Sequence, residues 1–315
     1  MTRKDLFDLA GVVSHGIGFK ITNGKKTSEI CVIVGVEVKK PLSELKAADV
    51  IPKSIGGMNT DVIETGKVGI FADPTKKFRP VVGGISIGHK DITAGTLGCF
   101  VTKDGKILAL SNNHVLANSN KGQIGDAICQ PGPYDGGEQC GTLHSFKEIG
   151  FVGASDCKIA NAFVRLLNGL AEMVGSRSRV RAIRDLTNTC DCALCEMLPD
   201  VGIANTILEI GTPTGSAEVT LGTPIKKFGR TTLFTQGTVD QIDATIQVSY
   251  GETEVAIFTG QIIAGPMSAG GDSGSAVLDG DNAVIGLLFA GSDTVTVINP
   301  IKDVMAALGC EIWTR

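Results

Sequence analysis

A serine in a glycine-rich turn is the strongest chemical signal in this sequence. Ser273 lies in the run Gly271-Asp272-Ser273-Gly274-Ser275, between a Gly/Ser-rich loop and the apolar stretch 276–278. A serine hydroxyl is a weak nucleophile without a base in hydrogen-bond reach, and acyl transfer also needs N–H donors aimed at the oxyanion. Gly271 allows a turn in which its own N–H and that of Ser273 converge. These residue types also favour a plain turn, so the pentapeptide alone leaves both interpretations open.

A histidine after an apolar run is the candidate base. His114 lies near the end of KILALSNNHV (residues 106–115), and the chain has only four histidines. An imidazole at this position could accept the serine proton and return it later. His15 and His89 lack such a context, and His144, in GTLHSF, is the remaining competitor.

An aspartate is expected to orient this histidine. Asp156 opens the apolar stretch 156–164, which we predict to be a strand, and it lies between His114 and Ser273 in the chain. Asp126 and Asp135 could take the same role. The spacing and the apolar residues that follow favour Asp156.

The order of these three residues carries a family resemblance. With GDSG at Ser273 and NNHV at His114, the chain resembles the chymotrypsin/trypsin-like serine peptidases. It is similar to their bacterial branch, because Val115 stands where secreted trypsins have a cysteine. The resemblance covers roughly residues 81 to 308 and implies two six-stranded β-barrels with the site in the cleft between them.

The resemblance also implies a role for each residue. Ser273 would attack the carbonyl, His114 would act as general base, Asp156 would hold the imidazole, and the N–H groups of Gly271 and Ser273 would form the oxyanion hole. The residues expected to bind substrate are Met267 at the base of the specificity pocket, Ser268 next to it, and Phe289, Ala290 and Gly291 along the substrate backbone. Trypsins have an acidic residue where this chain has Met267, so we expect an apolar or small P1 residue rather than Lys or Arg.

The run Val81–Gly84 resembles the new N-terminus of an activated trypsin, whose amine pairs with the aspartate before the serine, here Asp272. Pro80 follows Arg79 and would block tryptic cleavage there. We therefore expect another donor to hold Asp272.

The elements that must position these residues are predicted to be mostly short strands. Two strands (16–22 and 29–38), a short helix after Pro41 and a strand at 61–64 predict a small α+β N-terminal unit over residues 1–70. Residues 81–315 are predicted to form a mostly β, chymotrypsin-like double β-barrel, with a polar insertion at 165–200 and a C-terminal helix at 299–308. Its clearest strands are 95–101, 106–115, 156–164, 245–250, 254–260, 275–278, 283–290 and 294–298.

The net charge and the apolar runs of the chain indicate which partners and which cell compartment to expect. The 315 residues carry a formal net charge of -4, which gives no argument for nucleic acid or an anionic membrane as a partner. No apolar run is long enough to span a membrane, and Met1 to Gly16 lacks a signal-peptide pattern. The basic run Arg177 to Arg184 is interpreted as a solvated loop face.

Nine cysteines, several in apolar runs, favour free thiols in a reducing cytoplasm over a secreted disulfide framework. Cys129 and Cys140 could still face each other across a hairpin. Cys190, Cys192 and Cys195 could bind zinc, but no fourth ligand lies at metal-site spacing, so no metal and no cofactor are expected.

These observations predict a cytoplasmic serine endopeptidase that acts on polypeptides through an acyl-enzyme at Ser273. Nucleic acid and membrane are not expected as partners, and self-association into a homo-oligomer is left open. Two alternatives remain at this point. The chain could be a non-catalytic relative that binds peptides, or a peptidase that cleaves only itself.

Overall fold

The computed structural model describes the whole chain except residues 1–2, 23, 67, 69–71, 154–156, 179, 181, 183–186, 252–253 and 315. The chain forms two compact units, Met1–Ala72 and Asp73–Arg315. Each unit has its own hydrophobic core.

The N-terminal unit is built on one four-stranded sheet in the order β1-β2-β4-β3. β1 (Val12–Thr22) runs antiparallel to β2 (Lys25–Val36), and β4 (Met58–Glu64) runs parallel to β2 and pairs with β3 (Ser54–Ile55). The described helical turns of this unit are 3-10 helices, so two short turns stand where one helix was expected after Pro41: η1 (Arg3–Asp8), η2 (Leu42–Glu44) and η3 (Ala47–Asp49).

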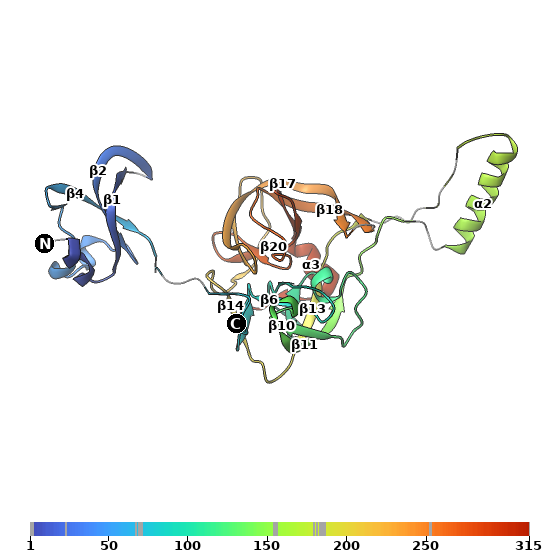
Figure 1. Ribbon diagram of the computed structural model, residues 1–315, viewed down its shortest axis with the longest axis horizontal. Helices are drawn as coiled ribbons and strands as arrows, with labels where there is room; N and C mark the ends of the chain where they lie inside the picture. The colour runs from blue at the N-terminus through green and yellow to red at the C-terminus, as the bar shows by residue number, and fades with distance from the viewer. Residues whose placement is uncertain are drawn as a thin grey trace. The chain divides into compact units, whose positions relative to one another are not determined.

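The second sheet of the larger unit closes into a barrel (Figure 1). Because β21 pairs with both β18 and β20, the strand order β16-β17-β18-β21-β20-β19 returns to β16. Two short strands, β12 (Thr187–Asn188) and β15 (Gly215–Ser216), add to its rim. The six ring strands are β16 (Pro224–Gly229), β17 (Leu233–Tyr250), β18 (Glu254–Ala264), β19 (Ala276–Leu278), β20 (Ala283–Gly291) and β21 (Thr296–Pro300).

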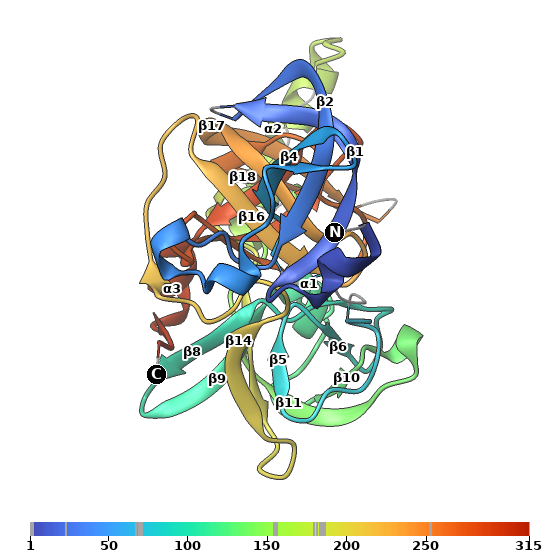
Figure 2. The same cartoon turned by 90° about the vertical axis from the view of Figure 1, so that its left-hand side faces the viewer.

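The first sheet of this unit curls around a core of its own (Figure 2), in the order β22-β8-β9-β13-β11-β10-β6-β7. A separate parallel pair is formed by β5 (Val81–Gly83) and β14 (Ile203–Ile207). The strands of the curled sheet are β6 (Ser86–His89), β7 (Gly95–Thr96), β8 (Cys99–Lys103), β9 (Lys106–Ser111), β10 (Ala127–Gln130), β11 (Glu138–Phe146), β13 (Ala193–Met197) and β22 (Glu311–Ile312).

Strands β8 and β9 are apolar on both faces because both faces are buried. Phe100 and Ala109 point into the core of the first sheet, whereas Val101 and Leu110 pack in a second core with Ala276 of the other sheet. Side chains alternate between the faces of a strand, so a continuous apolar run is what two buried faces require. Helix α3 (Ile301–Leu308) covers this shared core with Ile301, Val304 and Leu308. The predicted mostly β, two-barrel fold with a C-terminal helix is confirmed.

Two segments of the larger unit differ from their predictions. The strand expected over 156–164 is wrong, because Lys158–Met173 form helix α2. Ile159, Phe163, Leu166 and Leu170 recur at helical spacing, which the prediction overlooked. Residues 193–197, assigned to the 165–200 insertion, are β13 of the first sheet. Among the described residues, no helix has both the length and the apolar character needed to cross a membrane.

Candidate active site

A buried aspartate holds His114. The histidine lies on α1 (Asn113–Leu116), a single turn that directly follows β9. Asp191 Oδ2 lies 2.6 Å from His114 Nδ1, and the backbone N–H of His114 donates to Oδ1 at 3.2 Å. Asp191 is fully buried and the imidazole is 23% exposed. A carboxylate at Nδ1 favours the tautomer that carries its proton there, which leaves Nε2 free to accept one.

Buried amides fix the backbone on which Asp191 lies. Asn112 Nδ2 donates to the carbonyl oxygen of Asp191 at 2.8 Å, and the N–H of Asp191 donates to Asn299 Oδ1 at 2.9 Å. Asn299 in turn donates to Gln261 Oε1 at 2.6 Å, and Gln261 donates to Thr189 O at 2.8 Å. Since Asn112 follows β9 and the other two amides lie on β18 and β21, residues of both barrels hold this segment.

Tyr250 is a further donor to the same carboxylate. Its hydroxyl lies 2.7 Å from Asp191 Oδ2, and its ring stands edge-on to His114 at a centroid distance of 5.9 Å. Phe151 packs against the other side of the ring. Burial raises the pKa of Tyr250 far above its ordinary value, and the charge of Asp191 raises it further, so the phenol keeps its proton.

Sequence reasoning missed Asp191. The predicted Asp156 lies outside the described residues, and the carboxylate that the structure places at His114 Nδ1 is Asp191. The two alternative aspartates lie elsewhere: Asp126 accepts from His89 Nε2 at 3.0 Å, and Asp135 pairs with Arg230. The competing histidine, His144, contacts the neighbouring Ser145 hydroxyl through Nδ1 at 3.1 Å.

The turn that carries Ser273 packs against the strands that lead to His114. The carbonyl oxygen of Ser273 accepts from the N–H of Thr96 at 2.8 Å, and Ser111 Oγ donates to the carbonyl of Thr96 at 2.7 Å. Gly274 has a φ of +96°, and a Cβ at this position would overlap both Ser111 Oγ and Thr96 O. Only glycine allows this close approach. The serine turn thereby contacts Ser111, which precedes His114 by three residues in the sequence.

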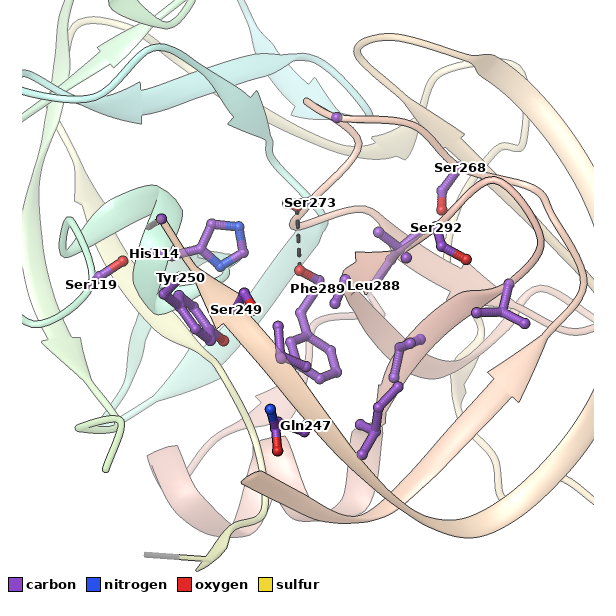
Figure 3. Close-up of a pocket in the computed structure, with 18 of the residues that line it drawn as sticks. His114, Ser119, Gln247, Ser249, Tyr250, Ser268, Ser273, Leu288, Phe289 and Ser292 are labelled. Atoms are coloured by element: carbon purple, nitrogen blue, oxygen red, sulfur yellow. Dashed lines mark hydrogen bonds between the residues drawn. The ribbon is translucent and has the colours of Figure 1, made fainter. Parts of the chain in front are cut away.

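Ser273 and His114 line one pocket of about 1050 Å³ (Figure 3). Ser273 Oγ lies 3.4 Å from the carbonyl oxygen of Phe289. Among the described contacts no hydrogen bond joins it to His114 Nε2. Catalytic hydrogen bonds are often long or poorly aligned without substrate. This rotamer of Ser273 is therefore compatible with His114 acting as its base when substrate is bound.

Two backbone N–H groups beside Ser273 are held in place. Thr231 Oγ1 donates to the carbonyl of Gly270 at 2.8 Å, and the Ser275 hydroxyl donates to the carbonyl of Asp272 at 2.6 Å. The C=O and N–H of a trans peptide point in opposite directions, so these bonds also orient the N–H groups of Gly271 and Ser273. Neither N–H has an acceptor within the described part of the chain. An oxyanion hole formed by these two N–H groups stays a prediction.

An internal lysine holds Asp272. Lys227 Nζ lies 3.4 Å from Asp272 Oδ2, and both side chains are fully buried. The carboxylate also accepts from the N–H groups of Ala269, Thr231 and Thr232 at 3.0, 2.9 and 3.1 Å. Burial lowers the pKa of Lys227, and the charge of Asp272 opposes that shift.

The run Val81–Gly84, which resembles the N-terminus of an activated trypsin, instead begins the parallel strand pair of β5 and β14. Val81 is a buried residue inside the chain, and its N–H donates to the carbonyl of Gly202 at 3.0 Å. The expectation that another donor holds Asp272 is met by Lys227.

The predicted substrate-binding residues line the pocket with one exception. Ser268, Phe289, Ala290 and Gly291 are among its lining residues. Met267 is not, because its buried side chain packs in a core cluster with residues of β16 to β21. Where the Met267 thioether was expected, the pocket is lined by Ser268. The Ser268 hydroxyl lies 2.8 Å from Thr296 Oγ1.

Within the described part of the chain no disulfide joins any of the nine cysteines, Cys129 and Cys140 included. Burial raises the pKa of Cys99 and of Cys140 to about 12, so both keep their protons at neutral pH. Cys190 and Cys192, on either side of Asp191, have sulfur atoms 3.4 Å apart.

Replacing Lys227 with Met is expected to lower the free energy of unfolding by about 3–5 kcal/mol, because it leaves the Asp272 charge buried without its cation. Urea unfolding followed by circular dichroism measures the loss. Lys226→Met, one residue earlier on β16 and half-buried, is the matched control and should cost less than about 1 kcal/mol. Equal costs for the two variants would show that the ion pair does not stabilise this turn.

Several known proteins are similar to this chain. A protein-family model described as Trypsin matches residues 168–306. Streptogrisin-D of Streptomyces griseus is 32% identical over 104 residues, a match that covers 31% of this chain and 25% of that protein. Two solved structures each cover 75% of this chain and 99% of their own at 18% identity: chymotrypsin of Cellulomonas bogoriensis (TM-score 0.48) and Protease A of Thermobifida fusca (TM-score 0.49). The two sequence matches confirm that this chain is related to the trypsin-like serine peptidases.

Proposed function

We propose that this protein is a serine endopeptidase whose catalytic residues are Ser273, His114 and Asp191. The observation that carries the proposal is the 2.6 Å contact between His114 Nδ1 and the buried Asp191, in the pocket that Ser273 also lines. A nucleophile, a base and a group that orients the base are the parts that acyl transfer requires.

In the proposed mechanism the Ser273 hydroxyl turns from the Phe289 carbonyl to His114 Nε2 and attacks the substrate carbonyl carbon. His114 accepts the hydroxyl proton, and Asp191 stabilises the imidazolium that forms. The N–H groups of Gly271 and Ser273 bind the oxyanion. His114 then protonates the leaving amine, and water attacks the resulting ester with His114 again as base.

We further propose a cytoplasmic location and action on polypeptides other than the chain itself. The preference for an apolar or small P1 residue gains support from the lining residues Leu288, Ala290 and Val295. Asp293 and the Lys121–Glu254 pair, at 3.4 Å, are charged groups of the same pocket that substrate residues next to P1 could meet.

Ser273→Ala and His114→Ala should each abolish labelling by a fluorophosphonate probe, because only an activated serine reacts with it. Each should also lower kcat by about 10⁶, the loss seen when either residue type is removed from subtilisin. Hydrolysis of a peptide library measures activity. A wild-type chain that neither labels nor cleaves would support the non-catalytic alternative, and a change of intact mass in the wild type alone would support self-cleavage.

Asp191→Asn should lower kcat by about 10⁴, because the amide favours the wrong imidazole tautomer. Asp156→Asn is the matched comparison and should change kcat less than threefold. Circular dichroism checks that both variants fold. The reverse order of effects would return the orienting role to Asp156.

Tyr250→Phe should lower kcat by roughly tenfold to a hundredfold with little change in KM, because a hydrogen bond to a charged group is worth about 1.5–3 kcal/mol. The loss should fall on kcat since Tyr250 acts through Asp191. Tyr134→Phe is the control: this other tyrosine of the chain is 75% exposed and lies against Arg230. A change confined to KM would mean that Tyr250 serves substrate binding instead.

A further inference from the structure

Helix α2 presents an apolar face that no described residue of the chain buries. None of the residues from Lys158 to Met173 is buried. Six large apolar side chains recur every three or four residues and so share one face of the helix. Each is more than half exposed: Ile159, Phe163, Leu166, Leu170, Met173 and Val174. Exposed apolar surface of this extent marks an interaction site more often than a free surface.

The opposite face of α2 is polar and holds the chain segment that follows the helix. Asn168 Oδ1 accepts from the N–H of Val180 at 2.7 Å, and Asn168 Nδ2 donates to the carbonyl of Val180 at 3.0 Å. The chain therefore turns back after the helix, so that Val180 lies beside Asn168. Arg177, on this return, and Arg165, on the polar face, are both exposed. Both side chains are therefore accessible to an anionic partner.

The charge of this segment differs in sign from that of the whole chain. Residues 157–186 contain six basic and two acidic residues, a net charge of +4, whereas the chain as a whole carries -4. A helix with one apolar face, basic residues on its polar face and low overall hydrophobicity is typical of helices that lie in a bilayer interface. Its 16 residues are about 24 Å long, too short to span a bilayer.

We infer that α2, together with Arg177 just after it, binds the surface of an anionic phospholipid bilayer, with the helix lying flat. The apolar side chains enter the headgroup boundary, and Arg165 and Arg177 contact lipid phosphates. This inference differs from the expectation of no membrane partner, which considered only the total charge and the length of apolar runs. Neither consideration concerns a helix parallel to the membrane. The inference does not depend on the peptidase activity.

The test uses the full chain with Ser273→Ala, which prevents self-cleavage, and measures sedimentation with vesicles. Binding is expected to phosphatidylcholine vesicles that contain phosphatidylglycerol, and at least tenfold weaker binding to phosphatidylcholine alone. Raising the salt concentration should weaken the first, because screening removes the attraction between charges.

Two variants separate the contributions of the two faces. Phe163→Ser with Leu170→Ser should reduce binding to both vesicle types at least tenfold, and Arg165→Glu with Arg177→Glu should reduce it only for the anionic vesicles. Ala162→Ser, an exposed position at the edge of the polar face, is the control and should bind as the parent does.

Several outcomes would overturn the inference. One is equal binding, or none, to the two kinds of vesicle. Another is a dimer, seen by sedimentation velocity, that Phe163→Ser with Leu170→Ser dissociates while vesicles are not bound, since the helix would then contact a second copy. Retained vesicle binding in both double variants would place the lipid contact elsewhere on the chain.

Discussion

The site depends on satisfying the hydrogen-bonding needs of one carboxylate inside the protein. Asp191 is fully buried, and a buried charge without partners costs several kcal/mol. Three donors meet it: the backbone N–H and the imidazole of His114, and the hydroxyl of Tyr250. The orientation of the imidazole therefore follows from the need of the carboxylate for hydrogen bonds, and so does the position of Tyr250 at the end of β17.

The same requirement joins the two barrels. Asn112, Gln261 and Asn299 are fully buried amides from different strands, and each bonds to the backbone around Asp191 or to another of the three. Among the described residues Asn112 Oδ1 is buried without a hydrogen-bond partner, so the network leaves one acceptor unsatisfied. The shared apolar core beneath α3 brings these strands together, so the site is complete only when both barrels are folded and packed.

Residues in short local motifs were predictable, and those defined by distant contacts were not. GDSG identifies Ser273, NNHV identifies His114, and the apolar runs of β8 and β9 indicate buried strands. The signal for Asp191 is weaker than these two motifs. Asp191 opens the uninterrupted apolar run 192–195, whereas Lys158 and Asn161 interrupt the run after Asp156. Its partners lie 59 to 108 residues away in the chain, so sequence spacing could not reveal them. Tyr250 and Lys227 belong to no local motif.

The internal ion pair between Lys227 and Asp272 bears on how a peptidase of the proposed kind becomes active. A peptidase that needs a freshly cut chain end to shape its oxyanion turn stays silent until another enzyme cleaves it. Here the cation is part of β16 and is present as soon as the barrel closes. The turn around Asp272 is therefore shaped by folding of the barrel, without the charge of a new chain end.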